Sequence, residues 1–462
     1  MLKLQGKLVL VVGLGDTGLS MACYLARQGA RIRVADSRAE PPMARRLAEL
    51  LPKAVVHVGP FRAESFAGVD LIAISPGVDR LEPLIAKAVA NGLPLIGDVE
   101  LFAQALADKA GMAAPKIIAI TGSNGKTTVT TMVGEMCRRA GLSTVLAGNI
   151  GLPVLDALGD AERLGQPDAY VLELSSFQLE STKNLRCDAA TVLNISEDHM
   201  DRYANLPAYA TAKANIFAHA EALILNRDDP LVMAMARPAR SVWTFGLSAP
   251  VSDREWGLVE SGGERFLAQD GVRLMPVSEL LLAGQHNVTN AMAALALCRA
   301  VDLPYPPLIE ALQHFKGLPH RVEKVAEIGG VTYFDDSKGT NVGATVAAVT
   351  GSAGPVVLIA GGDGKGQNFA PLKDAVAKHA RAVILIGRDA ALIDSAICAS
   401  QVMIEHAPNM QSAVVRASQI AQPGDIVLLS PACASFDMFK NYKHRAEVFI
   451  DAVHRLRDPL AP

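Results

Sequence analysis

A unit of short apolar strand, turn and helix recurs along the chain and constrains its fold more than any other feature. The unit is clearest at the start, where an apolar run at 8–12 leads through a glycine-rich turn into a helical pattern at 19–26. Other apolar runs of strand length lie at 31–35, 69–74, 116–120, 169–174, 189–195, 356–360, 382–386 and 426–429. Strands that alternate with helices form open parallel sheets with crossover helices. The pattern therefore predicts the α/β class.

The length of the chain, 462 residues, is too great for one ordinary domain. An alanine-rich segment at 103–114 and the sequence Gly317-Leu318-Pro319 interrupt the strand–helix pattern. We therefore predict three domains, at residues 1–108, 109–317 and 318–462. Residues 241–282 carry no motif to which a function can be assigned.

Composition excludes several classes of protein. The chain is 50% hydrophobic and 20% charged, which favours large cores over disorder. The formal net charge of −3 argues against nucleic acid or an anionic membrane as the main partner. No apolar stretch approaches the about 20 residues of a membrane span, and no signal-peptide pattern opens the chain. The six cysteines are scattered without CxxC spacing, as expected of reduced core residues. We therefore expect a cytoplasmic protein.

The first glycine-rich loop, Gly13-Leu14-Gly15-Asp16-Thr17-Gly18, fits GxGxxG between a strand and a helix. Asp36 closes the next strand, where a dinucleotide-binding fold places its ribose-binding acid. The loop predicts a phosphate at a helix N-terminus, and Asp36 predicts a contact to a sugar hydroxyl. The pattern alone does not choose between NAD and another nucleotide, and the alternative is a tight turn that only packs strand against helix.

The second glycine-rich loop reads Thr-Gly-Ser-Asn-Gly-Lys-Thr-Thr over 121–128, again between a strand and a helix. It is a variant of the phosphate-binding P-loop, because position 120 is Ile where the strict pattern has Gly. Lys126 can reach the β- and γ-phosphates of ATP, and the Thr127 hydroxyl can ligate Mg²⁺. The alternative is an ordinary helix N-terminus.

Glu173 and His199 follow two apolar strands of the same region. The carboxyl ends of parallel strands line the ligand crevice of an open α/β sheet. Both side chains are therefore expected to face the second glycine loop, where they can hold Mg²⁺. The alternative is a pair of solvated loop residues.

Lys213 lies inside the apolar face of a helix predicted over 207–220. The other residues of that face are Tyr209, Ala212, Ile216, Phe217 and Ala220. Burial favours the neutral amine of a lysine, which can react with CO₂ to give an anionic carbamate and so ligate a second Mg²⁺. The alternative is a lysine that extends its ammonium group to solvent.

Polar clusters continue toward the C-terminus. Asn287 and Asn290 open an alanine-rich helix and suit adenine or ribose recognition, or simple N-capping. Arg321, at the second predicted boundary, can reach ATP phosphates. Polar loops at 335–341, 361–365 and 430–436 each follow an apolar strand and predict the site of a small polar substrate; the alternative is that they are only polar connections.

These segments together resemble the Mur ligase family over nearly the whole chain. The matching segments, in order, are GLGDTG, TGSNGKTT, GNIG, LELSSFQLE, NISEDHMDRY, TAKANIF, GQHNVTNAMAALA, GLPHR, FDDSKGTN, GGDGK and SPACASFDMFKNY. The resemblance implies a Rossmann-like N-terminal domain, a P-loop ATPase-like central domain and a Rossmann-like C-terminal domain. It also implies that the first glycine loop binds uridine diphosphate and not NAD.

The resemblance further assigns a role to each group of residues. The implied ATP-binding residues are Gly122, Asn124, Gly125, Lys126, Thr127, Thr128, Asn287, Asn290, Arg321 and Asp336. The implied metal ligands are Thr127, Glu173, His199 and Lys213 as its carbamate. The implied UDP-sugar contacts are Asp16, Thr17, Asp36, Ser37, Arg38, Gly77, Asn149, Ser175 and Gln178. The implied D-glutamate contacts are Lys338, Thr340, Lys365, Ser435, Phe436 and Tyr442. The implied catalytic set is Lys126, Glu173, His199, Lys213 and Asp336.

The reaction that the resemblance implies is ATP-dependent addition of D-glutamate to UDP-N-acetylmuramoyl-L-alanine in cell-wall precursor synthesis. Such a ligase needs ATP, Mg²⁺ at two sites and the carbamate, and is expected to act as a monomer. An acyl phosphate forms first, and either His199 or Asp336 then takes a proton from the attacking amine. Rival hypotheses are a family member that adds another amino acid, a folylpolyglutamate synthase and a nucleotide-sensing module. An NAD-dependent oxidoreductase is also possible, but it leaves Lys126 and Glu173 unexplained.

Overall fold

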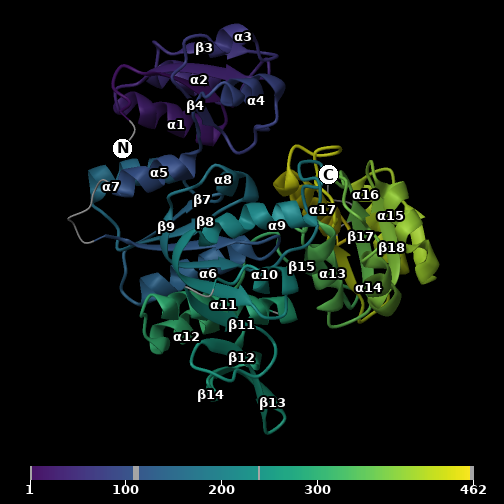
Figure 1. Cartoon of the computed structure of the whole chain (residues 1–462). Helices are drawn as coiled ribbons and strands as arrows, with labels where there is room; N and C mark the ends of the chain where they lie inside the picture. Colours follow the sequence, from purple (N-terminus) through teal and green to yellow (C-terminus); the bar gives the residue numbers. More distant parts are fainter. Residues whose placement is uncertain (1–2, 108–113, 238–239, 283, 458–462) are drawn as a thin grey trace.

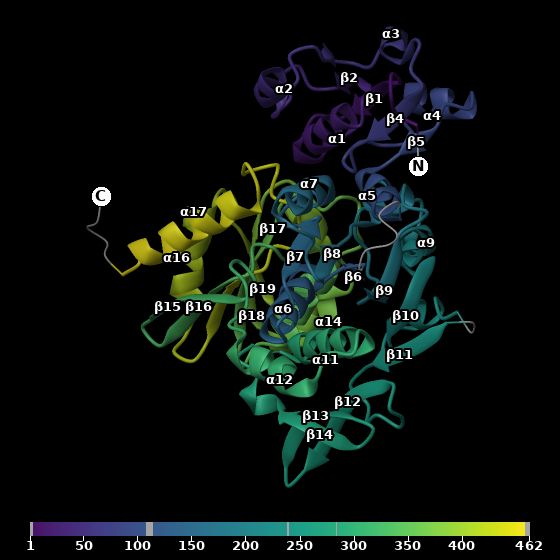
Figure 2. The same ribbon diagram turned by 90° about the vertical axis from the view of Figure 1, so that its left-hand side faces the viewer.

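A computed structural model describes residues 3–107, 114–237, 240–282 and 284–457. Three α/β bodies follow one another along the chain, and Figures 1 and 2 show the first stacked on the second and the third beside the second. The predicted three-part α/β architecture is confirmed, because each body is built around its own sheet. The predicted boundary between 108 and 109 lies outside the described residues.

The N-terminal sheet is parallel, with the strand order β3-β2-β1-β4-β5. Its strands are β1 (Leu8–Val12), β2 (Arg31–Asp36), β3 (Val55–Val58), β4 (Leu71–Ile74) and β5 (Leu95–Ile96). Its helices are α1 (Asp16–Arg27), α2 (Ala44–Leu50), α3 (Ala63–Phe66) and α4 (Pro83–Ala90), and α5 (Asp98–Ala107) leads to the central body. Chain order reverses at β1, so a ligand crevice is expected beyond the carboxyl ends of β1, β2 and β4.

The central sheet has the order β14-β13-β12-β11-β10-β9-β6-β8-β7. Its parallel part contains β6 (Lys116–Thr121), β7 (Thr144–Gly148), β8 (Ala169–Glu173), β9 (Arg186–Val192) and β10 (His219–Asn226). Residues of the 241–282 segment, which carried no motif, extend this sheet with β11 (Ser241–Phe245), β12 (Glu255–Ser261), β13 (Glu264–Gln269) and β14 (Val272–Pro276). This extension projects from the central body in Figure 1.

Helices cover both faces of the central sheet. They are α6 (Lys126–Arg139), α7 (Val154–Leu164), α8 (Ser176–Glu180), α9 (Leu206–Ala214), α10 (Pro230–Met233), α11 (Gln285–Ala300) and α12 (Tyr305–His314). The apolar sides of α6, α11 and α12 share one core with the sheet. On the opposite side, α5 and α7 join the core of the N-terminal body, so burial of apolar surface ties the first two bodies together.

The C-terminal sheet has the order β15-β16-β20-β17-β18-β19 and is parallel except at β15. Its strands are β15 (Glu323–Ile328), β16 (Val331–Asp335), β17 (Val356–Gly361), β18 (Ala380–Ile386), β19 (Met403–His406) and β20 (Ile426–Leu429). Its helices are α13 (Val342–Thr350), α14 (Leu372–His379), α15 (Ala390–Ile397), α16 (Met410–Ile420) and α17 (Tyr442–Arg455). Residues from alternate positions of the central strands fill two cores, one on each face.

The helix predicted over 207–220 is wrong beyond residue 217. Helix α9 ends at Ala214, a 3₁₀ turn covers Asn215–Phe217, and strand β10 begins at His219. Ala220 is buried as a strand residue that pairs with Cys187. The predicted apolar helix face thus combines residues of helix α9 and strand β10. A short apolar run does not by itself distinguish helix from strand.

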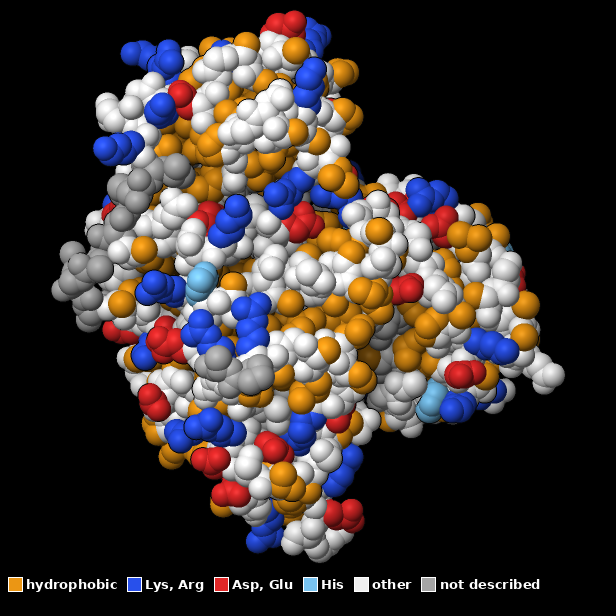
Figure 3. All heavy atoms as spheres, viewed as in Figure 1, with side chains coloured by type: hydrophobic (Ala, Val, Ile, Leu, Met, Phe, Trp, Pro, Cys, Tyr) orange, Lys and Arg blue, Asp and Glu red, His pale blue; other side chains and the backbone are white. Residues whose placement is uncertain are grey.

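Charged side chains are spread over the molecule. The face in Figure 3 mixes basic and acidic groups, as the small net charge leads one to expect. No helix among the described residues is long and apolar enough to cross a membrane.

Candidate active site

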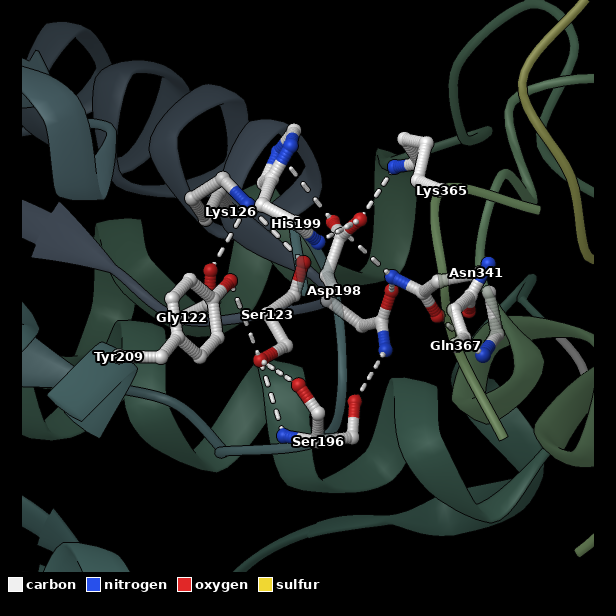
Figure 4. A network of polar contacts seen from close by, with 12 residues as sticks. Gly122, Ser123, Lys126, Ser196, Asp198, His199, Tyr209, Asn341, Lys365 and Gln367 are labelled. Atoms are coloured by element: carbon white, nitrogen blue, oxygen red, sulfur yellow. Dashed lines mark hydrogen bonds and ion pairs between the residues drawn. The ribbon is translucent and has the colours of Figure 1, made fainter. Parts of the chain in front are cut away.

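The second glycine loop joins β6 to α6. Gly125, which caps the helix, has φ +83°, a conformation that glycine adopts without strain. Lys126 Nζ donates hydrogen bonds to the carbonyl oxygens of Gly122 and Ser123 at 2.8 and 2.9 Å (Figure 4). Burial of the amine lowers the pKa of Lys126, and the charge of Glu173 acts in the opposite direction. The loop thus holds its lysine at the point where a phosphate-binding loop needs it.

The segment after β9 fixes this loop from the other side. Asn194 accepts a hydrogen bond from the backbone N–H of Asn124 at 2.8 Å and donates one to the carbonyl oxygen of Asn124 at 3.1 Å. The Ser123 hydroxyl donates to the carbonyl oxygen of Ser196 and accepts from the Ser196 N–H, both at 2.9 Å. Sequence reasoning missed Asn194 and Ser196. Their position directly after a buried strand next to β6 was the available signal.

Glu173 ends β8 with only 2% of its surface exposed. Its Oε1 accepts a hydrogen bond from Asn149 Nδ2 at 2.7 Å, whereas its buried Oε2 has no hydrogen-bond partner among the described residues. A buried carboxylate oxygen is costly unless a cation or donor meets it. Carboxylate oxygens are the ligands that Mg²⁺ prefers. The residues present therefore fit a magnesium ion beside the glycine loop.

His199 follows Asp198 in the loop after β9. Its backbone N–H donates to Asp198 Oδ1 at 3.0 Å, and its ring meets the edge of Phe177 with centroids 4.8 Å apart. Burial lowers the pKa of His199 to about 4, despite the neighbouring carboxylate of Asp198. The imidazole is therefore neutral near pH 7 and can bind a metal or accept a proton.

Lys213 is only 1% exposed, so it does not extend its amine to solvent. Its Nζ lies 3.4 Å from Thr121 Oγ1 and 4.6 Å from the centre of the Tyr209 ring. Burial, with a smaller effect of the Lys126 charge, lowers the pKa of Lys213 well below its usual value. A neutral amine beside the carboxyl end of β6 suits carbamate formation.

The C-terminal body reaches the glycine loop through several side chains. Arg321 Nη2 donates to Thr127 Oγ1 at 2.7 Å, and Asn341 Nδ2 donates to Asn124 Oδ1 at 2.9 Å. Lys365 forms an ion pair with Asp198, which Figure 4 shows in the same network as Lys126 and His199. Side chains from two domains thus meet at the P-loop, and the positive charge of Arg321 and Lys365 suits stabilisation of a transferred phosphoryl group.

Asp336 and Lys338 lie in the loop after β16. The carboxylate of Asp336 accepts a hydrogen bond from Ser430 Oγ at 2.7 Å, and burial raises the pKa of Asp336 to about 7. Lys338 Nζ lies 4.1 Å from the centre of the Tyr442 ring, and burial together with the Arg321 charge lowers the pKa of Lys338 to about 8. The predicted polar loops follow β16, β17 and β20, which are neighbours in the sheet, so they meet at one edge.

A cavity of about 120 Å³ lies where the central and C-terminal bodies meet. Its lining includes predicted ATP-binding residues from both bodies, namely Asn124, Gly125, Thr128, Asn287, Asn290, Arg321 and Asp336. Segments almost two hundred positions apart in the sequence are thus brought together beside the glycine loop.

A second cavity, of about 850 Å³, lies between the N-terminal and central bodies. It is lined by the predicted UDP-sugar residues Asp16, Thr17, Asp36, Ser37, Arg38, Gly77, Asn149 and Gln178. Ser175 does not line it, but caps α8 and accepts a hydrogen bond from the Gln178 N–H. Ser75, which sequence reasoning missed, donates through Oγ to the carbonyl oxygen of Gly13 and braces the first glycine loop.

The carboxylate of Asp36 differs from the ribose-binding acid of a dinucleotide fold. It accepts four hydrogen bonds, one from the Leu14 N–H and three from the backbone and guanidinium of Arg38. A carboxylate has about four acceptor positions, so little capacity remains for a sugar hydroxyl. Asp36 instead orders the first glycine loop and presents Arg38 to the cavity.

Of the remaining predicted D-glutamate contacts, Tyr442 packs against Lys338. Thr340, Ser435, Phe436 and Tyr442 line neither of these two cavities. Ser435 is buried, while Phe436 is 74% exposed.

Comparison with known proteins places these features in a family. Models described as Mur ligase MurD-like N-terminal domain, Mur ligase middle domain and Mur ligase glutamate ligase domain match residues 7–97, 120–298 and 320–433. The UDP-N-acetylmuramoylalanine–D-glutamate ligases of Methylobacillus flagellatus and Thiobacillus denitrificans are each 57% identical to this chain, covering 99% of both chains in the first case and 98% in the second.

Solved structures share the fold at lower identity. The UDP-N-acetylmuramate-alanine ligase MurC of Thermotoga maritima aligns with a TM-score of 0.60 at 19% identity, covering 97% of this chain and 99% of its own. MurF of Acinetobacter baumannii aligns with a TM-score of 0.60 at 18% identity, covering 98% of this chain and 91% of its own. Together with the matched domains and the close relatives, this likeness shows that the chain belongs to the Mur ligase family, whose members are ATP-dependent amide-bond-forming ligases.

Proposed function

We propose that this chain joins D-glutamate to UDP-N-acetylmuramoyl-L-alanine, with ADP and phosphate as the other products. Relatives named for this activity are 51–57% identical over nearly its whole length. The structural observation that carries the proposal is the gathering of four cations at the P-loop: Lys126 bonds to loop carbonyls, Arg321 to Thr127 and Lys365 to Asp198, and Lys338 lines a cavity together with Asn124 and Gly125. A triphosphate and two carboxylate substrates repel one another, so a site that assembles them needs several cations.

Mur ligases use ATP, generally with Mg²⁺. We propose that Thr127 and Glu173 hold one ion, and that His199 and a carbamate on Lys213 hold a second. The orphaned oxygen of Glu173, the neutral imidazole of His199 and the neutral amine of Lys213 support this arrangement. Bound Mg²⁺ would neutralise charge on the transferred phosphoryl group.

In the proposed reaction, Lys126 and Arg321 orient the phosphates of ATP while the alanyl carboxylate attacks the γ-phosphorus. The products of this step are ADP and an acyl phosphate. The amine of D-glutamate then attacks the acyl carbon, phosphate leaves, and a base takes the amine proton. Asp336 is the candidate base in this arrangement, and His199 is the alternative base only if its imidazole does not hold the ion. Contacts of the C-terminal body with the P-loop would keep water from the acyl phosphate.

The remaining assignments are proposals of the same kind. The UDP-sugar would occupy the large cavity, with Arg38 and the helix N-terminus of α1 at its phosphates. Lys338 and Lys365 would meet the carboxylates of D-glutamate, with Thr340, Ser435, Phe436 and Tyr442 around them. We also propose domain boundaries at 108/109 and 317/318, a monomer, and a cytoplasmic location.

Phosphate release tests the proposed function directly. With ATP, Mg²⁺ and UDP-N-acetylmuramoyl-L-alanine, release is expected with D-glutamate but not with L-glutamate or without an amino acid, and Lys126→Ala should abolish it. Release with a different amino acid would move the chain to another member of the family. No ATP turnover with any combination would overturn the proposal, and NAD binding would then be tested. The structure does not favour NAD, because the carboxylate of Asp36 already accepts hydrogen bonds from Leu14 and Arg38.

A further inference from the structure

Asp98 is a buried carboxylate that lies outside the P-loop site and accepts a side-chain hydrogen bond from Gln178. Asp98 is the first residue of α5 and is only 1% exposed. Its Oδ2 accepts a hydrogen bond from Gln178 Nε2 at 3.1 Å, and its buried Oδ1 has no hydrogen-bond partner in the described part of the chain. Burying a carboxylate is costly, and the Gln178 hydrogen bond together with the backbone N–H groups of Asp98 and Val99 offsets only part of that cost, since burial still raises the pKa of Asp98 to about 6. An apolar side chain at this position would avoid that cost, so the carboxylate is expected to have a function there.

Gln178 connects Asp98 to the large cavity. Its Oε1 accepts hydrogen bonds from the backbone N–H and the hydroxyl of Ser175, at 3.1 and 3.2 Å. The amide orientation is thereby set, because Oε1 must face the two donors of Ser175 and Nε2 must face Asp98. One N–H of Nε2 is used by Asp98, and Gln178 also lines the cavity, where a second N–H is the donor that its amide can offer.

Asp98 also stands at the connection between two bodies. It follows β5, the last strand of the N-terminal sheet, after only Gly97, and it meets Gln178 on α8 of the central body. Approach of the two segments is close, since a Cβ at Gly97 would lie 2.1 Å from Ser181 Oγ. The hydrogen bond between Asp98 and Gln178 thus crosses a tightly packed junction between the two bodies.

We infer that Asp98 is a positioning residue for the acceptor substrate: it holds the Gln178 amide so that one N–H faces the cavity between the N-terminal and central bodies. This inference deepens the proposed function, because it rests on that cavity being the UDP-sugar site. Asp98 itself does not touch the substrate. Its removal should weaken acceptor binding while ATP and D-glutamate binding stay unchanged.

The neighbouring Glu100 offers a matched control. It also lies on α5, and its carboxylate accepts hydrogen bonds from the N–H groups of Lys183 and Asn184 just after α8. It braces the same junction without touching Gln178. A purely structural role for Asp98 would make Asp98→Ala and Glu100→Ala behave alike.

The experiment measures the dissociation constant of UDP-N-acetylmuramoyl-L-alanine by calorimetry on the full chain without ATP, with thermal unfolding of each variant. Asp98→Ala should weaken binding about tenfold, which corresponds to about 1.4 kcal/mol. Asp98→Asn should bind as the unaltered chain does, because the asparagine amide oxygen can still accept the hydrogen bond from Gln178. Glu100→Ala should lower the melting temperature but leave the dissociation constant unchanged. If Asp98→Ala does not fold, Asp98→Ser replaces it, since a serine is too short to reach Gln178.

A double substitution completes the test. Gln178→Ala should weaken binding as Asp98→Ala does, and the pair should be no worse than Gln178→Ala alone, because the two residues act through one contact. Equal effects of Asp98→Ala and Glu100→Ala on acceptor binding, or no effect of Gln178→Ala, would overturn the inference. Neither result would touch the proposed function, which fails only if the unaltered chain lacks D-glutamate-dependent phosphate release.

Discussion

Lys213 shows how far a single residue can be interpreted from sequence. Its place within an apolar helix face predicted burial, and the structure confirms that burial. The contact of Lys213 with the Thr121 hydroxyl could not be predicted from helical spacing, because Thr121 comes from a strand that only the fold brings near. For the same reason, the hydrogen bonds of Asn194 with Asn124 and of Arg38 with the Asp36 carboxylate could not be predicted from the sequence.

If the proposed carbamate forms, Lys213→Ala should reduce ligase activity by about 100-fold, the upper end of the range for loss of a group that supports a metal site. In ¹³C-bicarbonate, the unaltered chain should give a carbamate carbon signal by NMR that the variant lacks. Lys53→Ala, which removes an exposed lysine of the N-terminal body, should keep both signal and activity. A carbamate signal that survives in Lys213→Ala would place the modification elsewhere.

Asp336 gives a pH prediction. Only the ionised carboxylate can take a proton, and the pKa of about 7 means that the ionised fraction rises as pH rises through 7. The kcat/KM for D-glutamate should therefore fall below pH 7. Ser430→Ala removes a hydrogen bond that favours the ionised form, so the inflection should move roughly one unit higher. An inflection that does not move in Ser430→Ala would assign the proton transfer to another group, such as His199.

Elements were predicted better than their ends. The strands and helices around both glycine loops lie where the apolar runs placed them, because periodicity and turn residues agree there. The segment 207–220 failed because α9 and β10 follow each other with only a 3₁₀ turn between them. The β11–β14 extension has no chemical motif, so sequence reasoning had no function to assign to it.

Gly125 and Gly141, at the two ends of α6, separate backbone strain from nucleotide binding. Both have positive φ, +83° and +90°, so alanine should cost each about 1–2 kcal/mol. An added Cβ at Gly125 would lie 2.6 Å from Asn290 Oδ1, whereas at Gly141 it would meet nothing within 4 Å. Thermal unfolding should therefore show loss of stability in both variants, but only Gly125→Ala should raise the KM for ATP, by tenfold or more. Equal KM values in the two variants would contradict the placing of the nucleotide at this loop.

At the scale of the whole molecule, the three-domain order was predictable, but the seating of the domains was not. Contacts between the central and C-terminal bodies join residues far apart in the chain, such as Asn124 with Asn341 and Glu197 with Asn368. Each side chain looks like an ordinary loop residue in the sequence. The hydrogen bonds between the two bodies show that these loops meet.

Asn341→Ala with Glu197→Ala should loosen the contact of the C-terminal body with the central body. Each lost hydrogen bond is worth about 0.5–1.5 kcal/mol, so the population of open molecules should rise several-fold. Small-angle scattering without ligands should then give a larger radius of gyration, and addition of ATP and UDP-N-acetylmuramoyl-L-alanine should reduce it. Glu135→Ala, which removes a surface ion pair on α6, is the control. Identical profiles for all chains, with and without ligands, would show that the bodies do not move.

The polar groups around the P-loop already bond to one another. Lys126 is held by the loop carbonyls, Arg321 by Thr127, and Lys365 by Asp198. A substrate that approaches these groups must exchange existing hydrogen bonds for new ones, so the net gain from each new bond is small. The heat of ATP binding should thus be small for so charged a ligand, and the driving force should come largely from the water that both surfaces release.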